Sequence, residues 1–323
     1  MTESTAAIRT EGLTKHYGDV RAVVDLNLET RMGEVYGFLG PNGSGKTTMI
    51  RTILDELRPT SGRAWILGLD SHRKVQEIRR HIGYVPGDLA MYPKLTGHDT
   101  LTYFANLRGG VDWAYVRQLA DRLDADLTKK VGDLSSGNRQ KIGLIQAFMN
   151  RPDVLIMDEP SAGLDPLMQR EFQAMIREVA AEGRAVFLSS HTLSEVQRVA
   201  DRVAIIRRGQ LVAVEALETL RSKAMRRVVL DFGSPVEAAV LEAVPGVRDV
   251  SVDNHRAELS FSGKMAVLLR AVAERYDLVD VNTHEADLEE IFLTYYRDEV
   301  HEKPQPDATD SRSPDELTDE VSV

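Results

Sequence analysis

Short apolar runs separated by longer amphipathic segments form the main pattern in the first 222 residues. The runs with the character of β-strands are Val35–Leu39, Arg63–Leu67, Val154–Met157, Ala185–Ser189 and Arg202–Ile206. The run at Val154–Met157 is apolar throughout, as expected of a strand that is covered on both faces. Strands that alternate with helical segments in this way predict an α/β fold with a mainly parallel sheet.

The pattern changes after residue 222. Predicted strands cover Arg227–Phe232, Val247–Val252, Arg256–Phe261 and Asp277–Asn282, and predicted helices cover Pro235–Ala243 and Gly263–Glu274. These elements predict a small α+β domain over residues 223–297, which closes with an amphipathic helix at Ala286–Tyr296. This region shows no catalytic pattern, and we interpret His255 and His284 as surface or capping residues.

The last segment, residues 298–323, differs in composition from the rest of the chain. Residues 301–323 contain seven acidic and two basic side chains, three prolines and almost no apolar residues. A segment of this composition cannot bury enough apolar surface to fold, so a disordered acidic tail is predicted.

Composition narrows the classes of function. Hydrophobic residues make up 42% of the chain and charged residues 28%, which is typical of a globular protein. The net charge of −10 does not favour a broad surface for nucleic acid, and the absence of cysteine excludes disulfides and a cysteine nucleophile. There is no apolar run of about 18 residues and no signal-peptide pattern at the start, so we expect any membrane role to require a partner.

A phosphate-binding loop is predicted directly after the strand Val35–Leu39. Its residues fit the pattern G-x-x-x-x-G-K-[ST], and the candidate binding residues are Gly40, Pro41, Asn42, Gly43, Ser44, Gly45, Lys46, Thr47 and Thr48. Glycines allow backbone N–H groups to turn inward around phosphates, and the following helix adds the positive end of its dipole. We expect Lys46 to reach the β- and γ-phosphates and the Thr47 hydroxyl to bind Mg²⁺.

Two adjacent acids complete this candidate site. Asp158 and Glu159 follow the apolar run Val154–Met157, which places both at the edge of the sheet where α/β proteins bind ligands. We expect Asp158 to hold Mg²⁺ and Glu159 to act as the general base that activates water.

Four further segments indicate which family of phosphate-binding proteins the sequence resembles. They are His16-Tyr17-Gly18 before the loop, Leu134-Ser135-Ser136-Gly137-Asn138, Pro160 to Pro166, and His191 after the strand Ala185–Ser189. In this order, the motifs resemble those of the ATP-binding subunits of ABC transporters, over residues 8–215.

The resemblance implies a fold and a set of roles. The fold is a P-loop ATP-binding domain over residues 1–222 with a helical subdomain at about 76–152. Tyr17 would stack on adenine, and Ser135 and Gly137 would cap the γ-phosphate of ATP that is bound to a second subunit. Asp165 would couple the two sites, and His191 would contact the γ-phosphate.

The sequence departs from the family pattern in two segments. Ser136 and Asn138 replace a Gly and a Gln in the signature, although Ser135 and Gly137 remain. Gly87 stands where a Gln is expected after Pro86, so the contact of that Gln with Mg²⁺ or water is either made by Asp88 or absent.

The C-terminal domain resembles that of ABC-2 type exporters, which include antibiotic and multidrug efflux ATPases. The resemblance therefore implies an ATPase that uses ATP and Mg²⁺ to power a separate integral-membrane permease at the cytoplasmic face of the membrane. A second ATP-binding subunit would complete it, as a homodimer in preference to a heterodimer. Two alternatives are a soluble ABC-type ATPase that acts on ribosomes or DNA, and a regulator that binds nucleotide without hydrolysis. The single cassette disfavours the first, and the presence of Lys46, Asp158, Glu159 and His191 disfavours the second.

Overall fold

The computed structural model of the chain describes residues 6–223 and 226–284. The predicted helix at Ala286–Tyr296 and the predicted acidic tail at residues 298–323 lie outside this part. Within the described ranges, no helix is long and apolar enough to cross a membrane.

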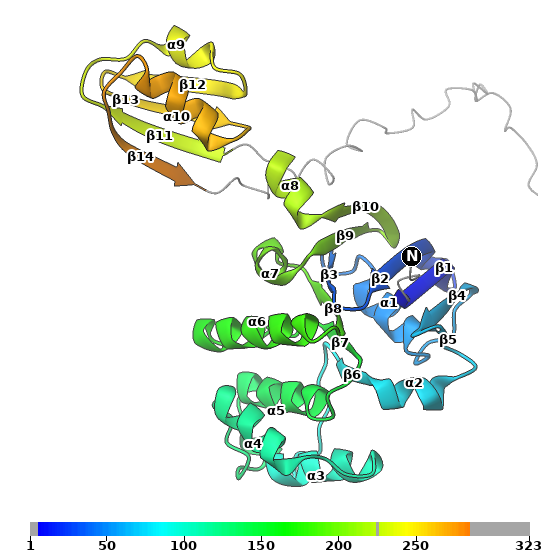
Figure 1. Ribbon diagram of the computed structural model, residues 1–323. Helices are drawn as coiled ribbons and strands as arrows, with labels where there is room; N and C mark the ends of the chain where they lie inside the picture. The colour runs from blue at the N-terminus through cyan, green and yellow to red at the C-terminus, as the bar shows by residue number, and fades with distance from the viewer. Residues whose placement is uncertain (1–5, 224–225, 285–323) are drawn as a thin grey trace, which may run out of the picture.

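A six-stranded sheet forms the centre of the first 222 residues (Figure 1). Its strands are β3 (Val35–Leu39), β6 (Ile82–Val85), β7 (Val154–Asp158), β8 (Ala185–Ser190), β9 (Arg202–Arg207) and β10 (Gln210–Ala216). The order is β10-β9-β3-β8-β7-β6, and only β10 pairs in the antiparallel sense. The predicted mainly parallel sheet is therefore confirmed, and β3, β7 and β8 are buried along their whole length.

Helices cover both faces of this sheet. The helices are α1 (Lys46–Ile53), α2 (Val75–His81), α3 (Gly97–Leu107), α4 (Trp113–Arg122), α5 (Ser136–Phe148), α6 (Pro166–Ala181), α7 (Leu193–Val199) and α8 (Leu217–Lys223). Alternate side chains of each strand enter two separate apolar clusters. One cluster holds Leu155 and Met157 together with side chains of α3–α7, and the other holds Val154 and Ile156 together with side chains of α1.

One predicted strand belongs to a different sheet. The run predicted at Arg63–Leu67 lies in β4 (Ser61–Ile66), which joins β1 (Ala6–Tyr17), β2 (Val20–Arg31) and β5 (Leu69–Asp70) in an antiparallel sheet of order β2-β1-β4-β5. In β4 only Ala64 and Ile66 are fully buried, so one of its faces remains open. Antiparallel sheets tolerate this half-exposed pattern, whereas the strands of a parallel core do not.

The helices α3, α4 and α5 lie between β6 and β7, within the range of about 76–152 expected for a helical subdomain. The strand β6 falls inside the same range but belongs to the central sheet. The Thr96 side chain caps α3 in a reciprocal capping box with Asp99, and Asp112 caps α4. These local signals start both helices at defined residues.

The C-terminal unit is an antiparallel sheet with two helices on one face. Its elements are β11 (Arg226–Phe232), α9 (Ala238–Glu242), β12 (Val247–Asp253), β13 (Arg256–Phe261), α10 (Met265–Ala273) and β14 (Leu278–His284). The βαββαβ connection with the strand order β12-β13-β11-β14 is the ferredoxin-like arrangement. The helix predicted at Pro235–Ala243 begins only at Ala238, because Glu237 is extended and the Val236 N–H bonds to the Asn254 carbonyl.

Candidate active site

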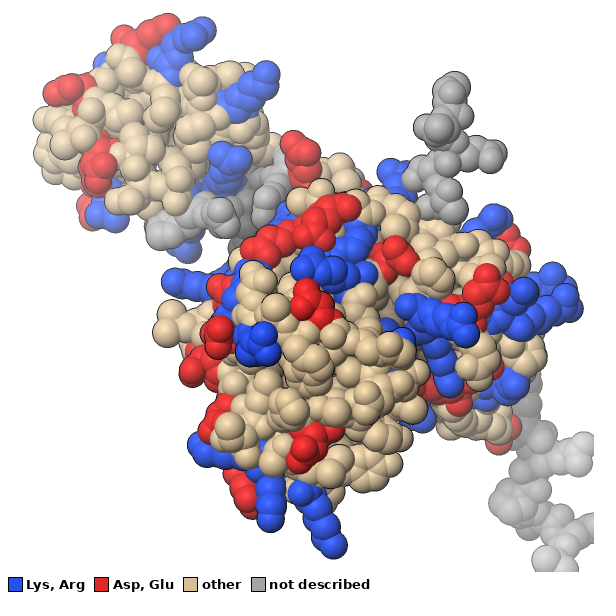
Figure 2. All heavy atoms as spheres, turned by 60° about the horizontal axis from the view of Figure 1, so that its bottom comes forward, with Lys and Arg blue, Asp and Glu red and all other residues tan. Residues whose placement is uncertain are grey.

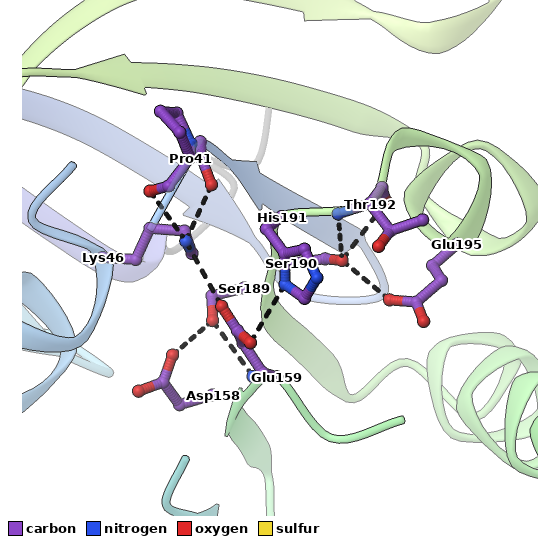
Figure 3. A network of polar contacts seen from close by, with 10 residues as sticks. Pro41, Lys46, Asp158, Glu159, Ser189, Ser190, His191, Thr192 and Glu195 are labelled. Carbon is purple, nitrogen blue, oxygen red and sulfur yellow. Dashed lines mark hydrogen bonds and ion pairs between the residues drawn. The ribbon is translucent and has the colours of Figure 1, made fainter. Parts of the chain in front are cut away.

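The loop Gly40–Gly45 joins β3 to the start of α1 and curls around one ammonium group. Lys46 is only 5% exposed, and its Nζ donates to the carbonyls of Gly40 (2.7 Å) and Pro41 (3.2 Å) (Figure 3). Gly45 adopts φ +108°, which strongly favours glycine, and a Cβ on Gly40 would meet the Ile206 carbonyl at 2.5 Å. The loop therefore needs glycine at these two positions to reach this shape.

The remaining loop residues differ in exposure. Pro41, Asn42, Gly43 and Thr47 are exposed, and Thr48 is half-buried. Ser44 is buried, and its hydroxyl has no hydrogen-bond partner in the described part of the chain. The backbone N–H groups at the start of α1 have no earlier helical carbonyl to bond, so they suit an anionic ligand.

Asp158 ends β7 as a fully buried carboxylate. Its Oδ1 accepts a hydrogen bond from the Ser189 hydroxyl, while its Oδ2 has no partner among the described residues. Burial raises the pKa of the nearby Tyr84 phenol above its ordinary value, and the charges of Glu56 and Asp158 raise it further, so Tyr84 stays neutral. Because no described residue bonds to the Asp158 Oδ2, this oxygen is available for a cation.

Glu159 adopts a left-handed backbone conformation with φ +49°, which is unusual for a residue with a side chain. Its N–H bonds to the Ser189 carbonyl (3.2 Å) and to the Ser189 Oγ (3.1 Å). Ser189 thus fixes both acids. A serine at the end of an apolar strand is not distinctive, so the sequence alone does not indicate this role.

The Glu159 carboxylate lies between a lysine and a histidine (Figure 3). Its Oε1 is 3.3 Å from Lys46 Nζ, and its Oε2 is 3.0 Å from His191 Nδ1. The loop that carries His191 is held by Ser190, whose hydroxyl contacts the Glu195 carboxylate at 2.7 Å. The structure therefore brings Lys46, Glu159 and His191 together, as a catalytic role for all three requires.

Gly87 passes directly over Asp158. A Cβ on Gly87 would have Asp158 Oδ2 as its nearest atom, at 3.0 Å. This distance is shorter than most Cβ contacts, so a side chain at position 87 would force the segment around Gly87 and the Asp158 carboxylate apart. Asp88 is exposed, and its side chain makes no hydrogen bond or ion pair within the described ranges.

The other candidate residues lie apart from this cluster. Tyr17 ends β1 with 47% of its surface exposed, and Lys15 Nζ lies 5.1 Å from the centroid of its ring. Ser135 caps α5 by accepting a bond from the Asn138 N–H, and Asp165 caps α6 by accepting from Leu167 and Met168. No hydrogen bond or ion pair joins Tyr17, Ser135, Gly137 or Asp165 to the cluster within residues 6–223.

Comparisons with known proteins agree on one family. The ABC transporter family model matches residues 23–162. The chain is 31% identical to the bacitracin transport ATP-binding protein BcrA of Enterococcus faecalis, over 88% of this chain and 94% of that protein. It is 34% identical to the daunorubicin resistance ATP-binding protein DrrA3 of Streptomyces coeruleorubidus, over 89% of this chain and 95% of that protein.

Solved structures give the same result for the fold. The structure of an ATP-binding subunit of an ABC transporter matches 67% of this chain and 92% of its own, with a TM-score of 0.62 and 28% identity. The dimeric structure of the bacterial ABC transporter cassette MJ0796 matches 65% of this chain and 98% of its own, with a TM-score of 0.60 and 23% identity.

Proposed function

The chain belongs to the ABC transporter family of ATP-binding proteins, and from that premise we propose that it powers a permease that exports antibiotics or other lipophilic compounds. Binding and hydrolysis of ATP are properties of this family. The support for export comes from relatives that match nearly their whole length and are named for bacitracin transport and daunorubicin resistance. The observation that supports the catalytic role is the cluster of Lys46, Glu159 and His191.

We assign Glu159 as the general base for water that attacks the γ-phosphate. Its carboxylate is held by Lys46 and His191, and its backbone is fixed by Ser189. Lys46 would turn from the loop carbonyls to the β- and γ-phosphates and neutralise charge that develops during transfer. His191 would then contact the γ-phosphate, since the same side chain already reaches the base.

The residues present fit a magnesium ion. Asp158 offers a buried Oδ2 that has no hydrogen-bond partner among the described residues, and Thr47 is an exposed residue with a hydroxyl at the start of α1. Hard oxygen ligands of this kind are those that Mg²⁺ binds, and the ion supplies positive charge to the phosphates. Asp88 is the first residue with a side chain beyond Gly87, so it is our candidate for the missing Gln contact.

A second ATP-binding subunit would complete the site. In the described part of the chain, no hydrogen bond joins Ser135 or Gly137 to the phosphate loop, and the family resemblance implies that they contact ATP held by the loop of another copy. We propose a homodimer in which each loop faces the Ser135–Gly137 segment of its partner. Tyr17, with its exposed ring, would stack on adenine, and Asp165 would lie between the two sites.

The surface of the helical layer suits a protein partner. Tyr92, Tyr103 and Leu107 are exposed by 60%, 44% and 67%, and the rings of Tyr92 and Tyr103 are in contact. They lie on α3 and on the loop before it. Figure 2 turns the bottom of Figure 1 forward and shows a largely uncharged central area with Lys, Arg, Asp and Glu side chains around it. We propose that the permease binds here and holds the chain at the cytoplasmic face of the membrane.

A role on nucleic acid lacks support. The face of the C-terminal sheet opposite its helices carries Arg227, Asp231, Arg256 and Glu258, in which acids and bases form ion pairs. No aromatic side chain among the described residues of β11–β14 lies on that face, because Phe232 and Phe261 enter the core. Sheets that bind single-stranded nucleic acid use stacked aromatics and excess positive charge.

The test is the Glu159→Gln allele, introduced at the native locus and also as a purified protein. The amide cannot accept the proton, so hydrolysis should fall by about 10²–10⁴, while ATP binding is retained. Cells with this allele should accumulate a panel of lipophilic antibiotics as strongly as cells that lack the gene.

The matched control is Glu29→Gln, which changes an exposed acid of β2. This variant should hydrolyse ATP and resist the panel like the wild type. Hydrolysis by Glu159→Gln within a few-fold of the wild type would contradict the base assignment. Unchanged accumulation of every compound would contradict drug export.

A further inference from the structure

The turn that follows Glu159 determines where its carboxylate points. Glu159 is in a left-handed conformation, and the N–H of Ala162 bonds back to the Glu159 carbonyl at 3.2 Å. Conformations of this kind persist only where surrounding contacts hold them. The Ser189 bonds hold the turn on its N-terminal side, so a second set of contacts must hold the other side.

A glutamine of α5 supplies the first of those contacts. Gln140 is 8% exposed, and its Nε2 donates to the Pro160 carbonyl at 2.9 Å. Pro160 is buried and directly follows Glu159 in sequence. The Gln140 amide therefore holds the peptide next to the proposed base.

The same helix also touches the turn through its backbone. A Cβ on Gly137 would lie 2.3 Å from the Gly163 carbonyl, and Gly163 has φ +77°. On the far side, Gln169 of α6 donates from Nε2 to the Leu164 carbonyl at 3.1 Å. The segment from residue 160 to residue 164 is thus held between two glutamine amides and one glycine contact.

We propose that Gln140 is a positioning residue that keeps the Glu159 carboxylate aligned for catalysis. The inference rests on the proposed role of Glu159 as general base. Gln140 does not touch that carboxylate, and it acts through the Pro160 carbonyl. Because Ser135 caps the N-terminus of α5, the same helix also connects the segment proposed to face the second ATP to the base of its own chain.

The test uses Gln140→Met in the full-length protein. Methionine has a similar length and volume but lacks the N–H donor, so the helix stays packed while the Pro160 carbonyl loses its partner. A small shift of a catalytic group is costly, so kcat should fall roughly tenfold. The KM and the Kd for ATP should stay within about twofold, because the phosphate loop is untouched.

Two further variants guard against a failure to fold. Gln140→Glu keeps the shape of the side chain and places an acceptor against the carbonyl, so it should lose at least as much kcat. Gln118→Met changes an exposed glutamine of α4 and should behave like the wild type.

A double variant distinguishes a positioning role of Gln140 from a purely structural one. If Gln140 acts through Glu159, then Gln140→Met should cause no further loss of turnover in a Glu159→Gln background. An unchanged kcat in both Gln140 variants would overturn the proposal and leave the role of Glu159 intact. Equal losses of kcat and ATP affinity would indicate a purely structural role and would also overturn it. Near-normal turnover by Glu159→Gln alone would instead remove the proposed base and this inference together.

Discussion

The central six-stranded sheet and the C-terminal four-stranded sheet differ in how their charged side chains are placed. At the edge of the central sheet, Asp158 is fully buried, one of its oxygens has no partner in the part of the chain that the structure describes, and Lys46 is 5% exposed. On the face of the C-terminal sheet opposite its helices, the side chains of Arg256 and Asp231 lie 3.9 Å apart and are 63% and 35% exposed. An exposed ion pair such as Arg256–Asp231 contributes little to stability. A buried carboxylate oxygen without a hydrogen-bond partner is costly, and a bound ligand would remove that cost.

Left-handed residues differ between the two regions as well. In the C-terminal unit, Asn254 has φ +52° in the turn between β12 and β13, where asparagine is an ordinary choice. At the end of β7 in the central sheet, Glu159 has φ +49°, and glutamate has no such preference. The first conformation is explained by its turn, and the second requires a set of dedicated contacts.

This contrast predicts a large effect of Phe261→Ala on stability alone. Phe261 is 1% exposed in the core of the C-terminal unit, so its removal should destabilise that unit by about 3–5 kcal/mol. Hydrogen exchange should show faster exchange in β11–β14, and hydrolysis by the purified protein should stay within about twofold. A strong loss of ATP hydrolysis together with normal hydrogen exchange in β11–β14 would contradict the prediction that Phe261 affects only stability.

Tyr17, at the end of β1 in the ATP-binding domain, should show the reverse behaviour. Tyr17 is 47% exposed, so Tyr17→Ala should hardly change the melting temperature. Removal of a stacking ring should weaken nucleotide binding by about 1–3 kcal/mol, and the KM for ATP and GTP should both rise, since both purines have a π-face.

Fluorescent-nucleotide titration checks this prediction directly. Tyr17→Phe is the matched control, since it keeps the ring and should bind normally. An unchanged KM for both nucleotides in Tyr17→Ala would remove the stacking role.

Local patterns made the phosphate loop and the central strands predictable. The loop at Gly40–Thr47 has fixed spacing, and an all-apolar strand before Asp158 is a strong signal. By contrast, β1 and β2 were not predicted, because long half-exposed strands show only weak alternation. Ser189 and Gln140 act through contacts between segments far apart in sequence, 31 residues from Asp158 and 20 from Pro160. Only the folded chain reveals such contacts, and the strand order of the C-terminal unit depends on long-range pairing in the same way.

The most direct test concerns the site shared between two copies. The chain has no native cysteine, so Asn42→Cys and Ser136→Cys place single thiols at two exposed positions of the loop and of the α5 N-terminus. Ser44 is unsuitable, since it is buried. In a Glu159→Gln background, the two thiols should form a disulfide between chains with ATP and Mg²⁺, which requires Cα atoms about 4.4–6.8 Å apart, and little with ADP. Equal cross-linking with both nucleotides, or cross-linking only within one chain, would contradict a site completed by a second copy.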